Sequence, residues 1–187
     1  IVSKQTFADA STGNVLARTG VELQSGQITY VSTRLKISNE QITEVEISFS
    51  DVQRVEAENI VRLDPLLTTI VAPEYRSSRE ELERIGRSYF QALTDHRPIE
   101  SDFDDVRCNR YHSGNKVTNN PNDAIEGAGQ RTCISSLQGP WGPAIEHRFP
   151  IIDPARGIVV GLTLLLYPND RQMYVSEVFK VMDGKIV

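Results

Sequence analysis

The feature that most constrains the fold is an ungapped match within the chain. Residues 7–43 align with residues 151–187 at an offset of 144, and nine of the 37 aligned positions are identical. The identities fall at turns as well as at apolar positions: Asp9/Asp153, Gly13/Gly157, Val15/Val159, Thr19/Thr163, Tyr30/Tyr174, Val31/Val175, Ser32/Ser176, Lys36/Lys180 and Ile42/Ile186. Because the turns stay in phase without a gap, the match predicts one structural unit that occurs twice.

Each copy is typical of antiparallel strands joined by short turns. The sequences "DASTG" (9–13) and "DPARG" (153–157) provide a first turn, with a glycine for positive φ. The sequences "SNEQ" (38–41) and "MDGK" (182–185) provide a second turn, and Asp-Gly is a strong hairpin signal. We therefore expect a strand–turn–strand–turn–strand meander in both copies.

The region between the copies has the pattern of a helix. In residues 77–98, Ser77 is the expected N-cap, Glu80 completes a capping box, and Pro98 ends the helix. Its apolar positions recur at helical spacing: Leu82, Ile85, Tyr89, Phe90 and Leu93. A short strand over 105–111, a polar loop and a short helix over 130–138 are expected to follow.

These patterns predict an α+β protein with three segments. Residues 1–50 hold the strands of a first module, residues 51–76 a linker, and residues 77–187 a complete second module. The first module lacks a helix. At the same offset its helix would precede Ile1, which we take as a processing boundary or as the truncated end of a longer chain. Of these alternatives we favour a second polypeptide that completes the first module. The apolar strand 157–167 predicts that the second sheet is covered on its back, by the first module as a pseudo-dimer or by another subunit in a homodimer.

Charge and hydropathy exclude several classes of protein. The net charge is −5 with acids and bases interspersed, which argues against nucleic-acid binding because that requires a basic face. The longest apolar run, 157–167, has the length of a strand, so we expect no membrane-spanning helix. The three histidines are not in metal-ligand spacing, and no nucleotide-binding or hydrolase motif occurs, so we expect no metal and no cofactor.

The two cysteines, Cys108 and Cys133, flank a polar loop. An even count without metal-ligand spacing is compatible with one disulfide, which would contribute roughly 3 kcal/mol by restricting the unfolded chain. A disulfide implies a secreted or lumenal protein, whereas two buried free thiols would fit a cytosolic one.

The helix, the short strand and the long strands ending in "FKVMDGKIV" resemble the nuclear-transport-factor-two-like, or SnoaL-like, superfamily. More closely, "RLKISNEQITEVE", "APEYRSSREEL", "YFQAL" and "CNRY" followed by a distant cysteine resemble fungal secreted proteins with two such modules in tandem. The resemblance implies a cone, in which helices pack into a curved antiparallel sheet around a pocket. Members of this superfamily include dehydratases, isomerases, cyclases and binding modules, so fold alone does not settle function.

Strand alternation selects the candidate chemical groups. In 106–112, Cys108, Arg110 and His112 are expected on one face, with Arg110 and His112 at a pocket mouth. In 145–153, His147 shares a face with Phe149. A histidine and an arginine beside an apolar cavity can act as an acid–base and anion-stabilising pair. The alternative is a hydrogen-bonded structural histidine and a surface arginine.

Three further candidates lie on the helix and the last long strand. Tyr89 can donate a hydrogen bond into the pocket or serve as a core residue, and Asp95 is disfavoured at a helix C-terminus unless it has a function or starts a turn. Glu177, which faces Thr33 in the alignment, has Phe179 among its apolar neighbours. Burial there would raise its pKa toward that of a useful base; the alternative is an ion-paired rim glutamate.

The sequence thus favours a cofactor-independent lyase or isomerase with dehydratase- or cyclase-like chemistry on a small organic molecule, such as a fungal secondary metabolite. His112, His147, Glu177 and Asp95 are the candidate acids and bases. Arg110, Tyr89, Phe149 and Phe179 are the candidate substrate contacts. The alternative is a secreted module that binds a small ligand, or an assembly module, without catalysis.

Overall fold

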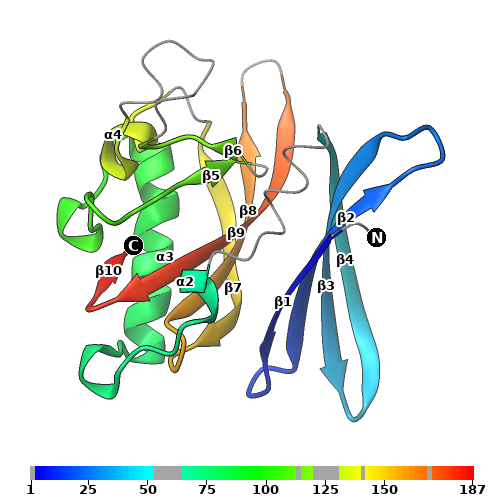
Figure 1. Ribbon diagram of the computed structural model, residues 1–187, viewed down its shortest axis with the longest axis horizontal. Coiled ribbons are helices and arrows are strands. Elements are labelled where there is room, and N and C mark those ends of the chain that lie inside the picture. Colours follow the sequence, from blue (N-terminus) through cyan, green and yellow to red (C-terminus); the bar gives the residue numbers. More distant parts are fainter. Residues whose placement is uncertain (1–2, 53–64, 113–114, 120–130, 140–141, 168–169) are drawn as a thin grey trace. The chain divides into compact units, whose positions relative to one another are not determined.

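The computed structural model describes residues 3–52, 65–112, 115–119, 131–139, 142–167 and 170–187 (Figure 1). The chain divides into two compact units, residues 1–68 with 112–115 and residues 69–111 with 116–187. Each unit contains one four-stranded antiparallel sheet, and most of the helical residues lie in the second unit. The expected α+β class is confirmed. The predicted boundaries at 50 and 76 stay predictions, because residues 53–64 lie outside the described part of the chain.

The first sheet is a meander in strand order β1-β2-β3-β4. Its strands are β1 (Ser3–Asp9), β2 (Asn14–Glu22), β3 (Ile28–Ser38) and β4 (Gln41–Val52). One face carries charge: Arg34 pairs with Glu44 at 2.7 Å and with Glu46 at 3.2 Å. The short helix α2 (Pro65–Thr68) is the described helix of this unit.

The second sheet has the order β7-β8-β9-β10. Its strands are β7 (Ala144–Asp153), β8 (Ile158–Leu166), β9 (Gln172–Met182) and β10 (Lys185–Ile186). Along β8 the side chains on both faces are buried, apart from Leu164 and Leu166, which are half-buried. This pattern is that of a strand covered on both sides, as its continuous apolar sequence predicts.

The two meanders agree in detail at an offset of 144. Adding 144 to the bounds of β2 and β3 gives the bounds of β8 and β9, and cross-strand partners shift by the same amount: Asn14 pairs with Lys36, and Ile158 with Lys180. The first turns share a left-handed glycine, Gly13 or Gly157, whose carbonyl accepts a backbone hydrogen bond at 2.7 Å.

The lysines that the alignment pairs occupy the same position beside these turns. Lys36 donates to the carbonyl of Thr12, and Lys180 donates to the carbonyl of Arg156 at 2.5 Å, 144 residues further along. Lys180 also donates to the Thr69 carbonyl at 2.6 Å, which ties the start of the second unit to its sheet. In each sheet, then, a lysine ammonium group donates to a backbone carbonyl of the first turn.

Helix α3 (Arg79–Asp95) packs on β7 and β8 (Figure 1). The five residues of the predicted apolar stripe are all buried. The predicted start is wrong by one residue: Ser78 is the N-cap, and its hydroxyl accepts from the Glu81 amide at 3.2 Å. "SSREE" offers two overlapping Ser-x-x-Glu patterns, and the helix uses the second. The Glu81 carboxylate accepts from Arg84 at 2.9 Å, and the helix ends at left-handed His96, before Pro98.

The predicted strand over 105–111 is wrong for most of its length. Strand β5 is only Tyr111–His112, pairs with β6 (Asn115–Lys116), and follows the 3₁₀ turn η2 (Glu100–Asp102). Asp104 folds the intervening chain into a turn, because its carboxylate accepts from the Arg107 amide at 3.0 Å and its carbonyl from the Cys108 amide at 2.7 Å. Local side-chain hydrogen bonding thus competes with strand pairing.

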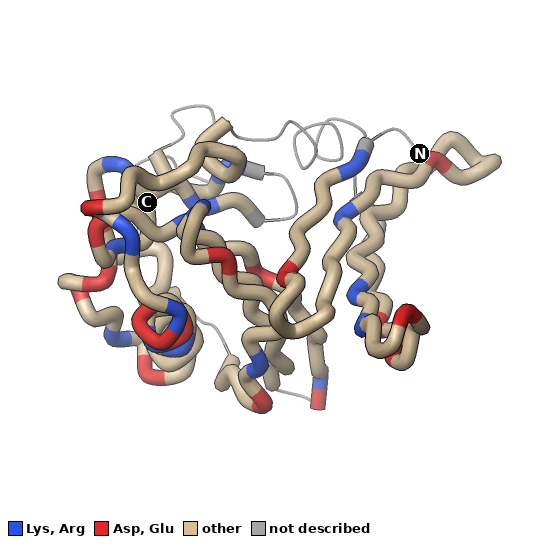
Figure 2. Tube along the Cα trace, turned by 90° about the horizontal axis from the view of Figure 1, so that it is seen from below, with Lys and Arg blue, Asp and Glu red and all other residues tan. Residues whose placement is uncertain are grey.

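The predicted short helix within 130–138 is present as α4 (Cys133–Leu137). Thr132 and Ser135 form a reciprocal capping box, each side chain accepting from the other residue's backbone amide. A further 3₁₀ turn, η1 (Pro73–Tyr75), precedes α3. Basic and acidic residues are interspersed along the described chain of both units (Figure 2).

Candidate functional site

Helix α3 and strand β9 place an aromatic cluster in the core of the second unit. The Tyr89 ring lies 4.7 Å from Phe179 and 5.7 Å from Phe90, between ring centroids. Tyr89 is buried because it lies on the apolar side of α3, one turn beyond Ile85. Its ring is therefore part of the core, which is the alternative that the sequence left open for Tyr89. Its hydroxyl group remains available for polar contact.

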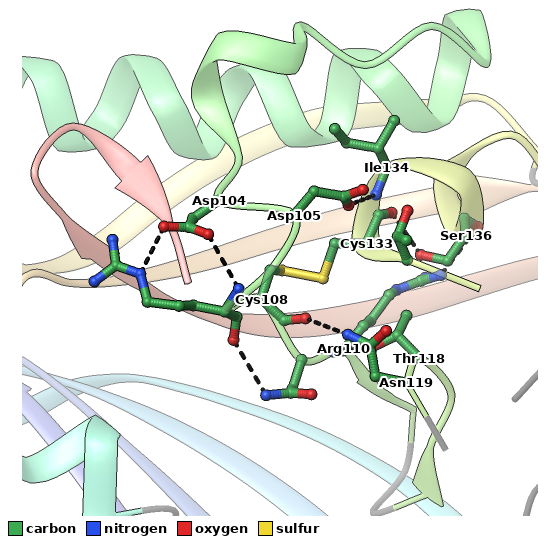
Figure 3. The surroundings of a disulfide bond; sticks show 12 residues. Asp104, Asp105, Cys108, Arg110, Thr118, Asn119, Cys133, Ile134 and Ser136 are labelled. Atoms are coloured by element: carbon green, nitrogen blue, oxygen red, sulfur yellow. Dashed lines mark hydrogen bonds and ion pairs between the residues drawn. A yellow bond between two sulfur atoms is a disulfide. The ribbon is translucent and has the colours of Figure 1, made fainter. Parts of the chain in front are cut away.

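A disulfide lies next to the segment that carries Arg110 (Figure 3). Cys108 is bonded to Cys133, the first residue of α4, with 5.9 Å between the Cα atoms. Two residues after Cys108, the Arg110 amide donates to the Thr118 hydroxyl at 2.8 Å. Its guanidinium donates to the Ser136 carbonyl of α4 at 3.4 Å. The predicted disulfide is confirmed, and it fixes both ends of the segment that orients the arginine.

Arg110 and Tyr89 form a direct hydrogen bond, in which the guanidinium Nε donates to the phenolic oxygen at 3.1 Å. Burial raises the pKa of the Tyr89 hydroxyl, Arg110 opposes that shift, and the Glu177 carboxylate adds to it, so the hydroxyl stays protonated at neutral pH. Burial also disfavours the charge on Arg110. Tyr89, Glu177 and Tyr167 outweigh that effect, so the pKa of Arg110 lies above its ordinary value.

Glu177 brings a carboxylate to the same place. It lies on β9 opposite Gly161 of β8, between Val175 and Phe179, whose side chains belong to the core under α3. Gly161 carries no side chain, and a Cβ there would come within 2.6 Å of the Phe90 ring. The half-buried Glu177 interacts electrostatically with both Tyr89 and Arg110. Three of the predicted residues, from three separate segments, therefore converge.

His147 and Phe149 both lie against Phe90, with ring centroids 5.0 and 5.8 Å from it. They share a face, as predicted, although β7 is irregular there: Glu146 has φ of 55° and the register shifts between Ile145 and Ile151. The His147 Nε2 is engaged with the Ala144 carbonyl at 2.8 Å. This geometry matches the alternative of a hydrogen-bonded structural histidine.

Two predicted residues do not join the group. Asp95 is exposed at the end of α3, where its carboxylate accepts from Gln91 at 2.8 Å. His112 ends β5, and its side chain lies outside the described part of the structure, so its role stays a prediction.

Two contacts of the site were missed by the sequence analysis. The Thr118 hydroxyl accepts a hydrogen bond from the Arg110 backbone amide, and Tyr167 interacts electrostatically with the Arg110 guanidinium. Tyr167 also lies under the Arg171 guanidinium, 5.5 Å from the ring centroid. No sequence pattern marks Thr118, whereas Tyr167 ends the apolar run 157–167 and could have been noticed as its one hydroxyl-bearing aromatic.

Two features are absent from the described residues. No group of three or more His, Cys, Asp or Glu residues there is arranged to hold a metal ion. No helix in the described ranges is long and apolar enough to cross a membrane.

The fold and the site define a disulfide-bonded α+β protein whose second unit has an aromatic core with an embedded arginine. The family described as "Domain of unknown function (DUF8021)" matches residues 75–187, and the chain belongs to this family. The match begins at the end of η1 and includes α3, the disulfide and the second sheet. No curated protein and no solved structure matches the chain.

Proposed function

We propose that the chain is a cofactor-independent lyase or isomerase that acts on a small organic molecule in its second unit. The observation that carries this proposal is the convergence of Tyr89, Arg110 and Glu177. A carboxylate, a guanidinium and a protonated phenol at an apolar core are the groups required to remove a proton from carbon and to stabilise the resulting charge.

In the proposed reaction, Glu177 takes a proton from a carbon next to a carbonyl group. The electron pair of that C–H bond forms a carbon–carbon double bond to the carbonyl carbon, and the π pair of the C=O bond moves to the oxygen. Arg110 and Tyr89 donate hydrogen bonds to the negative charge that develops there. The proton then returns to another carbon in an isomerisation, or to a departing hydroxyl group in a dehydration. His147 and Asp95 are weaker candidates for the base, because one is engaged with a backbone carbonyl and the other is exposed.

The proposal extends to the architecture and its setting. The matching strand bounds, registers and lysine contacts support two copies of one module, each a cone of the SnoaL-like kind. The Cys108–Cys133 disulfide supports a secreted protein, because such bonds persist in oxidising compartments. A tandem secreted protein of fungal type that acts on a secondary metabolite fits both features.

A second candidate is a module that binds a small ligand, or assembles with other proteins, without catalysis. The packing of Tyr89 against Phe90 and Phe179 favours it, because these rings fill part of the inner face of the sheet. In this case Arg110 would orient a ligand or stabilise the core, and Glu177 would serve only as its counter-charge.

Proton exchange in D₂O separates the two candidates. A panel of small ketones and 2-hydroxy acids is incubated with the protein, and loss of the proton next to the carbonyl is followed by NMR. We expect exchange with at least one compound, and Glu177→Gln to slow it by about 10²–10⁴-fold. Asp95→Asn is the matched control and retains the rate. Undiminished exchange in Glu177→Gln would exclude the assigned base. Saturable thermal stabilisation by a compound without exchange would favour the binding module.

A further inference from the structure

The first sheet has an apolar face that is half-buried along β2 and most of β3 and exposed to solvent along β4. We call it the β2–β4 apolar face; it comprises Val15, Ala17, Val21, Val31, Leu35, Ile37, Ile42, Val45, Ile47 and Phe49. Cross-strand pairing puts them on one side of the sheet: Phe49 lies opposite Val31, and Val45 opposite Leu35. The exposed fractions of Val45, Ile47 and Phe49 are 56, 58 and 76%. An apolar face of this kind marks an interaction site.

The second sheet shows what covers the equivalent face. At an offset of 144, Val15, Val21, Leu35, Ile37 and Ile42 correspond to Val159, Leu165, Phe179, Val181 and Ile186. All five of those residues are buried in the core that α3 completes. The strand registers agree residue by residue, so the same face is presented in both sheets, and in the second sheet its occupant is an amphipathic helix.

We propose that the β2–β4 apolar face binds an amphipathic α-helix with the apolar spacing that α3 uses on the second sheet. Such a helix would lay residues at i, i+3, i+4 and i+7 into the face. The inference rests on the first sheet and on its comparison with the second, and it does not depend on catalysis in the second unit.

One difference between the sheets makes the proposal specific. Ala17 of the first sheet stands where the second has Gly161. A Cβ at Gly161 would lie 2.6 Å from the Phe90 ring, so a helix on the first sheet cannot place a phenylalanine there unchanged. We therefore infer that the bound helix carries a smaller apolar residue at the position of Phe90.

The test uses two fluorescent peptides of residues 77–97, one with the native sequence and one with Phe90→Leu, titrated with the whole protein and followed by anisotropy. The Phe90→Leu peptide is expected to bind at least about threefold more tightly, because leucine relieves the contact with Ala17. Phe49→Asp in the protein should weaken binding at least about tenfold, because a charge would enter the apolar contact.

Ser50→Asp provides the matched control, since it adds the same charge to the neighbouring, exposed residue on the opposite face of β4. It should leave the affinity unchanged, and circular dichroism checks that both variants are folded. Absence of saturable binding by either peptide would overturn the proposal. Equal weakening by Phe49→Asp and Ser50→Asp would also overturn it. A dimer in solution that Phe49→Asp dissociates would overturn it in favour of a second copy of the chain.

Discussion

At the scale of single residues, buried polar groups in the second unit are held by specific partners. Asp102 illustrates this: its side chain is buried, and its two oxygens accept from the Arg84 guanidinium at 2.8 and 3.0 Å. Burial raises the pKa of this carboxyl, and hydrogen bonds from Arg84 and Ser88 outweigh it, so the pKa lies below its ordinary value. The pair joins α3 to η2.

We expect Asp102→Asn to lower the free energy of unfolding at pH 7 by about 1–3 kcal/mol, because Arg84 loses the buried one of its two charged partners. The carboxyl binds protons less readily folded than unfolded, so its contribution is present above about pH 4 and is lost as the pH falls below that. Urea unfolding at pH 7 and pH 3 should show a smaller difference at pH 3. The exposed pair Glu83–Arg87 is the control: Glu83→Gln should change stability by less than about 0.5 kcal/mol. An equal effect of Asp102→Asn at both pH values would contradict the assignment.

Residue-level prediction from the sequence succeeded where local patterns suffice. Tyr89 and Glu177 were selected from helix and strand periodicity, and the disulfide from the cysteine count. That Arg110 would bond Tyr89 could not be predicted, because it depends on the turn at Asp104 and on the hydroxyl of Thr118. Those contacts form between segments whose relative placement no periodicity encodes.

At the scale of elements, the sequence predicted which residues of α3 are buried but not the residue at which the helix begins. The buried stripe from Leu82 to Leu93 is set by 3.6-residue spacing, whereas the choice between Ser77 and Ser78 depends on one hydrogen bond. The irregularity of β7 could not be predicted either, because the residue with left-handed backbone there is Glu146 and not a glycine or asparagine, which would have indicated positive φ.

The cap assignment can be tested with a matched pair of variants. Ser78→Ala should lower the free energy of unfolding of the second unit by about 1 kcal/mol, because the Glu81 amide loses its acceptor. Ser77→Ala should have an effect below about 0.3 kcal/mol, since the residue precedes the cap. Chemical denaturation measures both. A larger effect at Ser77 would mean that the helix begins one residue earlier.

At the scale of the whole molecule, the two sheets can be compared as internal controls. Their turns between the third and fourth strands have positive φ at both central residues, at Asn39 and Glu40 in the first sheet and at Asp183 and Gly184 in the second. This geometry favours glycine at the second position, so the first sheet carries strain that the second avoids.

We therefore expect Glu40→Gly to stabilise the first sheet by about 0.5 kcal/mol, which is the relieved strain less the added flexibility of the unfolded chain. Hydrogen exchange measured by mass spectrometry should slow in peptides from β3 and β4, and peptides from β9 should be unchanged. The reverse substitution, Gly184→Glu, should accelerate exchange in β9 only. Equal changes in both sheets after either substitution would show that the two units unfold as one.

The disulfide has a consequence for how the integrity of the chain is judged. Because Cys108 and Cys133 are bonded, residues 108–133 form a closed covalent ring. A protease that cuts once within this ring produces two fragments that remain joined, so the nicked protein keeps its mass apart from one added water. If the cut lies between Arg110 and α4, the two belong to different fragments that the intact disulfide still joins. Electrophoresis without reduction therefore does not distinguish a continuous chain from one that has been cut within the ring, whereas electrophoresis after reduction does.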